Sequence, residues 1–176
     1  MVERALEKLI IAFNTEVIGY RYYSAASEIV DDEKGKDMFH HLAADELDHI
    51  KVLSGITESL KKEGKWLKYG EAKKAGERSI DEASLPIFPD DNLENLKKNS
   101  DELSAIKVGI EAEGKAIEYY SNMLKDAEDP DEKTVLIKLV DMERAHLKLL
   151  RWEQESIIQT GFWCDIMEFN IEKEIG

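Results

Sequence analysis

Four glutamates and two histidines occur at spacings that could hold a pair of metal ions. In each half of the chain, a lone glutamate precedes a Glu-x-x-His motif by 30 residues. The six residues are Glu16, Glu46 and His49 in the first half and Glu113, Glu143 and His146 in the second. Carboxylate and imidazole ligands together suit iron or manganese, and zinc is a further possibility. The pattern therefore predicts a dinuclear metal site.

The two copies of this pattern form an internal repeat with a constant offset of 97 residues. The same shift aligns residues 22–24 (Tyr-Tyr-Ser) with residues 119–121, and Asp32 with Asp129. A single Glu-x-x-His is weak evidence in a chain so rich in glutamate. An ungapped repeat that contains every residue a dinuclear site needs is much stronger evidence.

Each of the six residues interrupts an apolar stripe that has helical periodicity. Apolar residues at alternating spacings of three and four predict four long helices. Their expected ranges are about 2–30, 33–63, 101–127 and 130–159. Within a helix, Glu-x-x-His places its two side chains on one face, one turn apart, so that both can reach the same ion.

The connections between these helices predict an all-α fold. Short connections within each pair and a long one between the pairs indicate a four-helix bundle of two antiparallel hairpins joined by a crossover. We expect a single domain over residues 1–176. Its parts are a hairpin at 2–63, a crossover linker at 64–100, a second hairpin at 101–159 and a C-terminal extension at 160–176. Residues 69–83 could form a short helix within the linker, and the extension is expected to form a short C-terminal helix.

The charge of the predicted core is a second argument for metal ions. Burying one unpaired carboxylate costs several kcal/mol, and no Lys or Arg lies on the inward stripes near the four glutamates. Two divalent cations and two neutral imidazoles would balance four glutamates to zero net charge. By the symmetry of the repeat, the glutamate of each Glu-x-x-His is expected to bridge both ions. Each lone glutamate would share one ion with the histidine of its own half.

Tyr23 and Tyr120 lie two helical turns after the lone glutamates and on the same helix faces. Two interpretations stay open for them. They could donate hydrogen bonds to the ligand carboxylates or relay electrons and protons in catalysis. They could equally be buried tyrosines that fill the core and whose hydroxyls have hydrogen-bond partners. His40 and His41 have no counterparts in the repeat and are not expected to bind metal.

Composition excludes several classes of partner. The formal charge of −14 argues against nucleic acid and anionic membranes, since both require basic patches. The single cysteine, Cys164, excludes an internal disulfide and a four-cysteine metal site within these residues. The N-terminal segment MVERALEKLI lacks the apolar core of a signal peptide, and no run approaches the roughly 20 apolar residues of a membrane span. These features favour a cytoplasmic protein.

With these motifs, the sequence resembles the ferritin-like superfamily and, within it, the rubrerythrin-like proteins. The resemblance covers nearly the whole chain. It rests on the two Glu-X₂₉-Glu-x-x-His patterns, the segment IEAEGKAIEYYSNMLKDAEDPDEK and the tail GFWCDIMEFNIEKE. It implies a di-iron protein that reduces hydrogen peroxide or dioxygen. The alternatives are a ferroxidase that feeds iron storage, or a bundle that metal stabilises without turnover.

The chain departs from classical rubrerythrins in two ways. Those proteins carry a rubredoxin domain with four cysteines, so the resemblance implies here a separate electron donor such as a rubredoxin-type protein. They also carry a further ligand glutamate one turn after the third-helix glutamate, where this chain has Ala116 and, at the equivalent repeat position, Gly19. These small residues could leave space for a small oxidant or allow close helix packing. A homodimer is the expected assembly.

Overall fold

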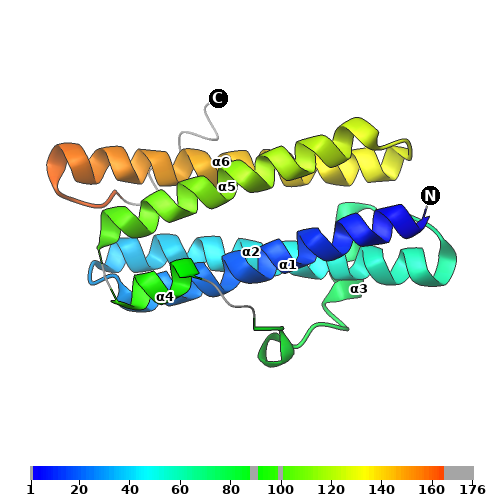
Figure 1. The fold of residues 1–176 in the computed structure, drawn as a ribbon, viewed down its shortest axis with the longest axis horizontal. Coiled ribbons are helices and arrows are strands. Elements are labelled where there is room, and N and C mark those ends of the chain that lie inside the picture. The colour runs from blue at the N-terminus through cyan, green and yellow to red at the C-terminus, as the bar shows by residue number, and fades with distance from the viewer. Residues whose placement is uncertain (1, 88–90, 99–100, 165–176) are drawn as a thin grey trace.

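The computed structural model describes residues 2–87, 91–98 and 101–164, and all regular structure in this part of the chain is helical. The elements are α1 (Val2–Ile29), α2 (Glu33–Glu63), α3 (Tyr69–Gly76), a 3₁₀ turn (Glu82–Ser84), α4 (Asp91–Lys98), α5 (Glu102–Asp126) and α6 (Pro130–Thr160). Two antiparallel pairs, α1 with α2 and α5 with α6, pack on each other (Figure 1). The predicted all-α bundle is confirmed. None of the described helices combines the length and apolar character that crossing a membrane requires.

The second helix of each pair begins and ends at matching residues. Asp32 and Asp129 are the N-cap residues, and their carboxylates accept hydrogen bonds from the first free backbone N–H groups of α2 and α6. Gly64 and Gly161 end the same helices with φ of 68° and 78°, in the left-handed conformation that glycine adopts most easily. Asp129 lies 97 positions after Asp32, and Gly161 lies 97 positions after Gly64. These helix boundaries therefore follow the offset of the repeat.

Tyrosine hydroxyls join the two hairpins where α1 faces α5. Tyr22 donates a hydrogen bond to the carbonyl oxygen of Ala105 at 3.1 Å, and Tyr119 donates one to that of Lys8 at 2.9 Å. The two donors are 97 positions apart, and so are the two acceptors. Losing the partner of a buried hydroxyl costs about 1–3 kcal/mol. These two equivalent bonds therefore help to hold one hairpin in register with the other.

The apolar core is divided into two main clusters, one toward each end of the bundle. The cluster near the α1–α2 connection includes Phe39 and Leu42, and the cluster toward the opposite end includes Leu53 and Leu136. All four of these side chains are completely buried. The six residues predicted to bind metal lie along the helices between the two clusters, which shield them from water at both ends.

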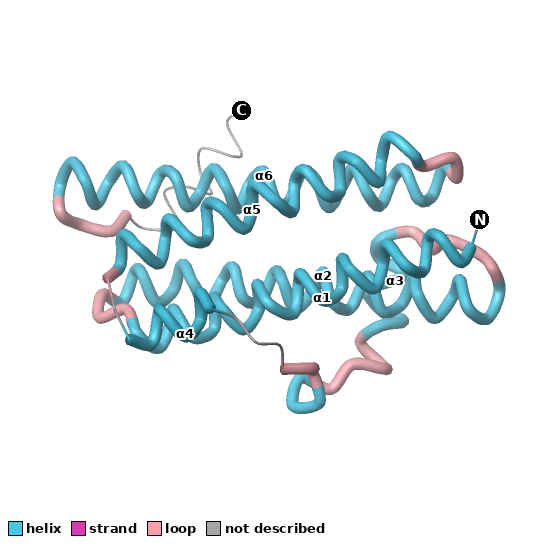
Figure 2. The backbone as a smooth tube through the Cα atoms, viewed as in Figure 1, coloured by secondary structure: helices cyan, strands magenta, loops and turns pink. Residues whose placement is uncertain are grey.

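The crossover between the hairpins contains more structure than the sequence predicted. The expected helix at 69–83 is shorter, since α3 ends at Gly76 and a 3₁₀ turn follows further along. Helix α4 was not predicted, and it packs against α1 and α5. It has eight residues and two leucines, of which Leu96 is buried, so it shows no periodic apolar stripe. Figure 2 shows how this crossover contrasts with the short loops inside each hairpin.

After α6 the chain turns back onto the bundle at Trp163. Its ring lies edge-on to Phe39, with centroids 5.9 Å apart, and its indole N–H donates to Glu102 Oε2 at 3.0 Å. These contacts attach the start of the C-terminal extension to the cluster near the α1–α2 connection. The predicted C-terminal helix falls mainly on residues 165–176, which lie outside the described residues, so it stays a prediction.

Helix α3 lies against the backbone of α2 at two glycines. A Cβ atom on Gly55 would be 2.1 Å from the carbonyl oxygen of Ala72, and one on Gly76 would be 1.9 Å from that of Lys51. Neither distance is possible for real atoms, and both neighbours are backbone atoms that cannot rotate away. Glycine at these two positions is therefore required by the close approach of α3 to α2.

Replacing Gly76 by alanine should lower thermal stability, although alanine is the better helix former. Overpacking costs about 1–3 kcal/mol, which corresponds to a fall in Tm of about 2–12 °C for a chain of this size. Gly70→Ala is the matched control, because it lies in the same helix and its Cβ would meet nothing within 4 Å. Melting curves recorded by circular dichroism test the difference. Equal Tm values for the two variants would contradict the packing.

Candidate metal centre

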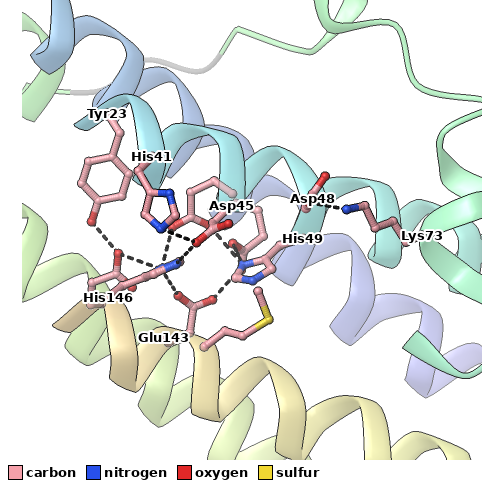
Figure 3. Close-up of polar contacts among 12 residues, drawn as sticks. Tyr23, His41, Asp45, Asp48, His49, Lys73, Glu143 and His146 are labelled. Atoms are coloured by element: carbon pink, nitrogen blue, oxygen red, sulfur yellow. Dashed lines mark hydrogen bonds and ion pairs between the residues drawn. The ribbon is translucent and has the colours of Figure 1, made fainter. Parts of the chain in front are cut away.

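The six predicted residues meet in the middle of the bundle. Glu16 comes from α1 and Glu113 from α5, while the two Glu-x-x-His motifs come from α2 and α6. All six residues are buried, and none of them is more than 4% exposed. Figure 3 shows His49, Glu143 and His146 pointing into the space between the hairpins. The six polar residues that interrupt the apolar stripes in the sequence therefore form one buried cluster in the structure.

The potential ligand atoms of this cluster form two overlapping groups. In each group, one such atom per residue lies within 4.8 Å of all the others. The first group is Glu16, Glu46, His49 and Glu143, and the second is Glu46, Glu113, Glu143 and His146. The glutamate of each Glu-x-x-His motif belongs to both groups. This is the arrangement expected where two carboxylates are shared between two neighbouring ions.

Each histidine presents Nδ1 to the carboxylates. His49 Nδ1 lies 3.2 Å from Glu16 Oε2 and 3.1 Å from Glu143 Oε1. His146 Nδ1 lies 3.1 Å from Glu143 Oε2. The two imidazole rings are stacked, with centroids 5.7 Å apart and planes 26° apart. Both Nδ1 atoms therefore lie where carboxylate oxygens converge, as a shared cation would require.

Unsatisfied oxygens show that the cluster fits a metal group. Glu46 Oε2 and Glu143 Oε1 are buried without a hydrogen-bond partner among the described residues. They belong to the two glutamates that both donor groups share. The ion-pair partners of the four glutamates in the described residues are the two histidines. Divalent cations would satisfy both oxygens and supply the missing positive charge, so geometry and charge both indicate a metal site.

Burial and mutual proximity change the proton affinities in the cluster. Burial raises the pKa of Glu46 well above its ordinary value, and the nearby charges of Glu16 and Glu143 raise it further. Burial and then Glu143 raise the pKa of Glu113 to about 8. Burial alone would lower the pKa of His49, but the adjacent carboxylates of Glu143, Glu16 and Glu46 together outweigh it and raise that pKa. At neutral pH the cluster therefore holds protons that an incoming cation must displace.

Metal binding should consequently release protons and become tighter as the pH rises. Glu113, with its pKa of about 8, and the imidazolium of His49 are both protonated at pH 6 without metal. Each must lose its proton to coordinate an ion. The association constant for Mn²⁺ or Co²⁺ should rise at least about tenfold per pH unit between about pH 6 and 8. Titration calorimetry in buffers of different ionisation enthalpy counts the released protons, and a count of zero would contradict these pKa shifts.

Tyr23 and Tyr120 donate hydrogen bonds to the lone glutamates across the hairpin interface. The Tyr23 hydroxyl lies 2.5 Å from Glu113 Oε1, and the Tyr120 hydroxyl donates to Glu16 Oε1. Burial, followed by the charge of the acceptor glutamate, raises the pKa of both tyrosines, so both keep their protons at neutral pH. The structure therefore shows both the hydrogen bonds and the burial of these tyrosines, and both interpretations stay open. A relay of electrons or protons stays a prediction.

Asp45 is a polar contact of the cluster that the sequence did not predict. Its Oδ2 lies 3.1 Å from His146 Nε2 and 3.5 Å from His41 Nε2 (Figure 3). Burial would raise the pKa of Asp45, but the hydrogen bond and charge of His146, with His41, outweigh it and lower that pKa. His41, not expected to bind metal, lies outside both donor groups. The only signal in the sequence is that Asp45 follows His41 by four residues and directly precedes Glu46.

A cavity of about 320 Å³ reaches the cluster between α1 and α5. Its lining includes Glu16, Glu46 and Glu113, whereas the two histidines of the cluster are not among the lining residues. Gly19 and Ala116, the small residues at equivalent repeat positions, both line it. Of the two explanations for these small residues, open space beside the carboxylates is the one the structure favours.

Comparison with protein-family models matches residues 7–153 to the family described as Rubrerythrin. The matched segment runs from the first turns of α1 into the last turns of α6 and includes every residue of the buried cluster. Comparisons with curated proteins and with solved structures return no match.

Proposed function

We propose that this chain, which belongs to the rubrerythrin family, binds two iron ions in its ferritin-like bundle and reduces hydrogen peroxide or dioxygen. The observation that supports the proposal is the buried cluster of four glutamates and two histidines, whose donor atoms form two groups that share two carboxylates. Family and donor set both favour iron, with manganese and zinc as alternatives. The chemistry would take place on the carboxylate side of the cluster, where the cavity reaches it.

In this proposal each ion has its own glutamate and histidine and shares the other two glutamates. Glu16 and His49 would serve one ion, Glu113 and His146 the other, and Glu46 and Glu143 both. Two ferrous ions would supply the two electrons that, with two protons, convert hydrogen peroxide into two water molecules. All six residues are buried, and the cavity beside Glu16, Glu46 and Glu113 gives an oxidant an approach to them.

Residues around the cluster would orient the ligands and admit the oxidant. The hydroxyls of Tyr23 and Tyr120 each occupy one oxygen of a lone glutamate, which leaves the other carboxylate oxygen for an ion. Their protons would also lie close to ions held by these glutamates, where general acid catalysis would need a proton donor. The cavity beside Gly19 and Ala116 is wide enough for a molecule the size of peroxide or dioxygen.

Electrons must reach the centre from elsewhere, because the 176 residues contain a single cysteine and cannot build a four-cysteine iron site. We propose a rubredoxin-type protein as the donor, and a cytoplasmic homodimer as the working form. Size-exclusion chromatography with light scattering checks the dimer. A large hollow shell would instead favour iron storage.

Stopped-flow mixing of the anaerobic, Fe²⁺-loaded protein with hydrogen peroxide tests the proposed activity. We expect the iron to be oxidised faster than free ferrous iron, with about one peroxide consumed per two ions. Oxidation no faster than that of free ferrous iron, with dioxygen as well as with peroxide, would reject the proposal. The centre would then be a metal clasp that stabilises the bundle.

Replacing Ala116 by leucine should slow this oxidation without removing a ligand. The larger side chain would fill the part of the cavity that borders the carboxylates. We expect a rate at least about tenfold lower, equivalent to a barrier about 1.4 kcal/mol higher. Gly114→Leu is the control, because a Cβ there meets nothing within 4 Å. An unchanged rate for Ala116→Leu, with two ions still bound, would show that the oxidant takes another route.

A further inference from the structure

The two histidines of the cluster differ on the side that faces away from the glutamates. His146 Nε2 lies 3.1 Å from Asp45 Oδ2, in hydrogen-bonding geometry. His49 Nε2 is fully buried and has no hydrogen-bond partner among the described residues. A carboxylate that accepts the Nε2–H bond holds the ring in the tautomer that leaves Nδ1 free for a cation, and it makes Nδ1 a stronger donor. Of the two histidines, His146 has such a carboxylate at its Nε2 atom, and His49 has none among the described residues.

The repeat shows that the difference is built into the sequence. At the offset of 97 residues, Asp45 corresponds to Met142, and His41 corresponds to Lys138. The Met142 sulfur accepts a hydrogen bond from the Tyr69 hydroxyl at 3.4 Å, and the Lys138 ammonium lies 4.0 Å from the centre of the Tyr69 ring. The second copy therefore has a thioether and a lysine where the first has a carboxylate and an imidazole. The glutamates and histidines of the cluster therefore occur in both copies of the repeat, whereas the aspartate that contacts a histidine occurs in the first copy.

Asp45 also adds charge to one half of the centre only. Its side chain is 29% exposed, and it lies between the buried His146 and His41, which is 48% exposed. A negative charge behind a neutral imidazole ligand strengthens the attraction of that ligand for a cation.

We propose that Asp45 makes the two metal positions unequal, so that the position of Glu113 and His146 binds its ion more tightly than the position of Glu16 and His49. This inference rests on the dinuclear centre proposed above. Asp45 acts through His146 and does not contact the ion, so it is a positioning residue. The inequality concerns cation affinity and can be measured without any oxidant.

Calorimetric titration of the metal-free protein with Co²⁺ or Mn²⁺ tests the proposal. The wild type should bind two ions in separate steps of different affinity. In Asp45→Asn, the tighter step should weaken by about 10–100-fold while the weaker step stays unchanged. The unchanged step shows within the same sample that the variant is folded.

Asp48→Asn is the matched control on the same helix. Asp48 is about as buried as Asp45, at 27% side-chain exposure, but it pairs with Lys51 and with Lys73. Figure 3 shows the pair with Lys73. This variant should alter neither step. Two equal steps in the wild type, or an equal loss in both steps of Asp45→Asn, would overturn the inference and leave the proposed function intact. A wild type that binds no ion would overturn both.

Discussion

Replacing Glu46 by glutamine should reduce the bound metal from two ions per chain to one at most. Glu46 belongs to both donor groups, and one of its oxygens is buried without a hydrogen-bond partner in the described structure. The neutral amide removes a negative charge that both ions need. We expect the association constant of each ion to fall more than about 100-fold. Mutating a residue that only hydrogen-bonds to a metal ligand typically costs about 10–100-fold, and the loss of a ligand should cost more. The fast reaction with peroxide should disappear with the ions.

Metal analysis after desalting, together with calorimetric titration, measures this loss. Glu111→Gln is the matched control, because Glu111 lines the same cavity two residues before Glu113 but is exposed and belongs to neither donor group. The control should still bind two ions. Without metal, Glu46→Gln should melt above the wild type at pH 8, since it no longer buries this carboxyl. Two ions bound to Glu46→Gln with wild-type affinity would refute the assignment of Glu46.

Removing the metal should lower the Tm of the wild type by about 8–16 °C. A ligand present at 1,000 times its dissociation constant stabilises the folded state by about 4 kcal/mol, and each kcal/mol shifts Tm by about 2–4 °C in a chain of this size. The ions would also offset the burial and the mutual repulsion of these carboxylates, which together raise the pKa of Glu46 and Glu113.

Differential scanning calorimetry with and without Mn²⁺ measures this difference. Mg²⁺ is the ion control, because it prefers oxygen ligands and retains its water molecules, so it should stabilise the protein much less. The Glu46→Gln variant is the protein control, and its Tm should respond weakly to Mn²⁺. Identical Tm values for metal-free and Mn²⁺-loaded wild type would count against a buried metal site.

The long helices and the meeting of the six residues were predictable because both are periodic features. Glu46 and His49 stand on one apolar stripe, and the shift of 97 residues repeats that stripe in the second half. Burial of these groups then follows from the stripe. The N-cap residues Asp32 and Asp129 occupy equivalent positions of the repeat, and Asp is a preferred N-cap residue.

Contacts between helices remote in sequence were not predictable in the same way. Asp45 lies beside its stripe, and its partner His146 is 101 residues away, so only the packing of α2 against α6 brings them together. The bond from Tyr23 to Glu113 spans 90 residues and depends on the register of α1 against α5. Helix α4 is too short for periodicity to reveal it. The small residues Gly19 and Ala116 indicated possible open space, but the extent of the cavity depends on where the neighbouring side chains pack.

Anomalous X-ray diffraction at the iron edge, on crystals loaded anaerobically with Fe²⁺, tests the central claim most directly. We predict two peaks inside the bundle, both between Glu46 and Glu143, one next to His49 and the other next to His146. A single peak there, no peak, or iron only on exposed carboxylates would contradict a dinuclear centre formed by the two hairpins.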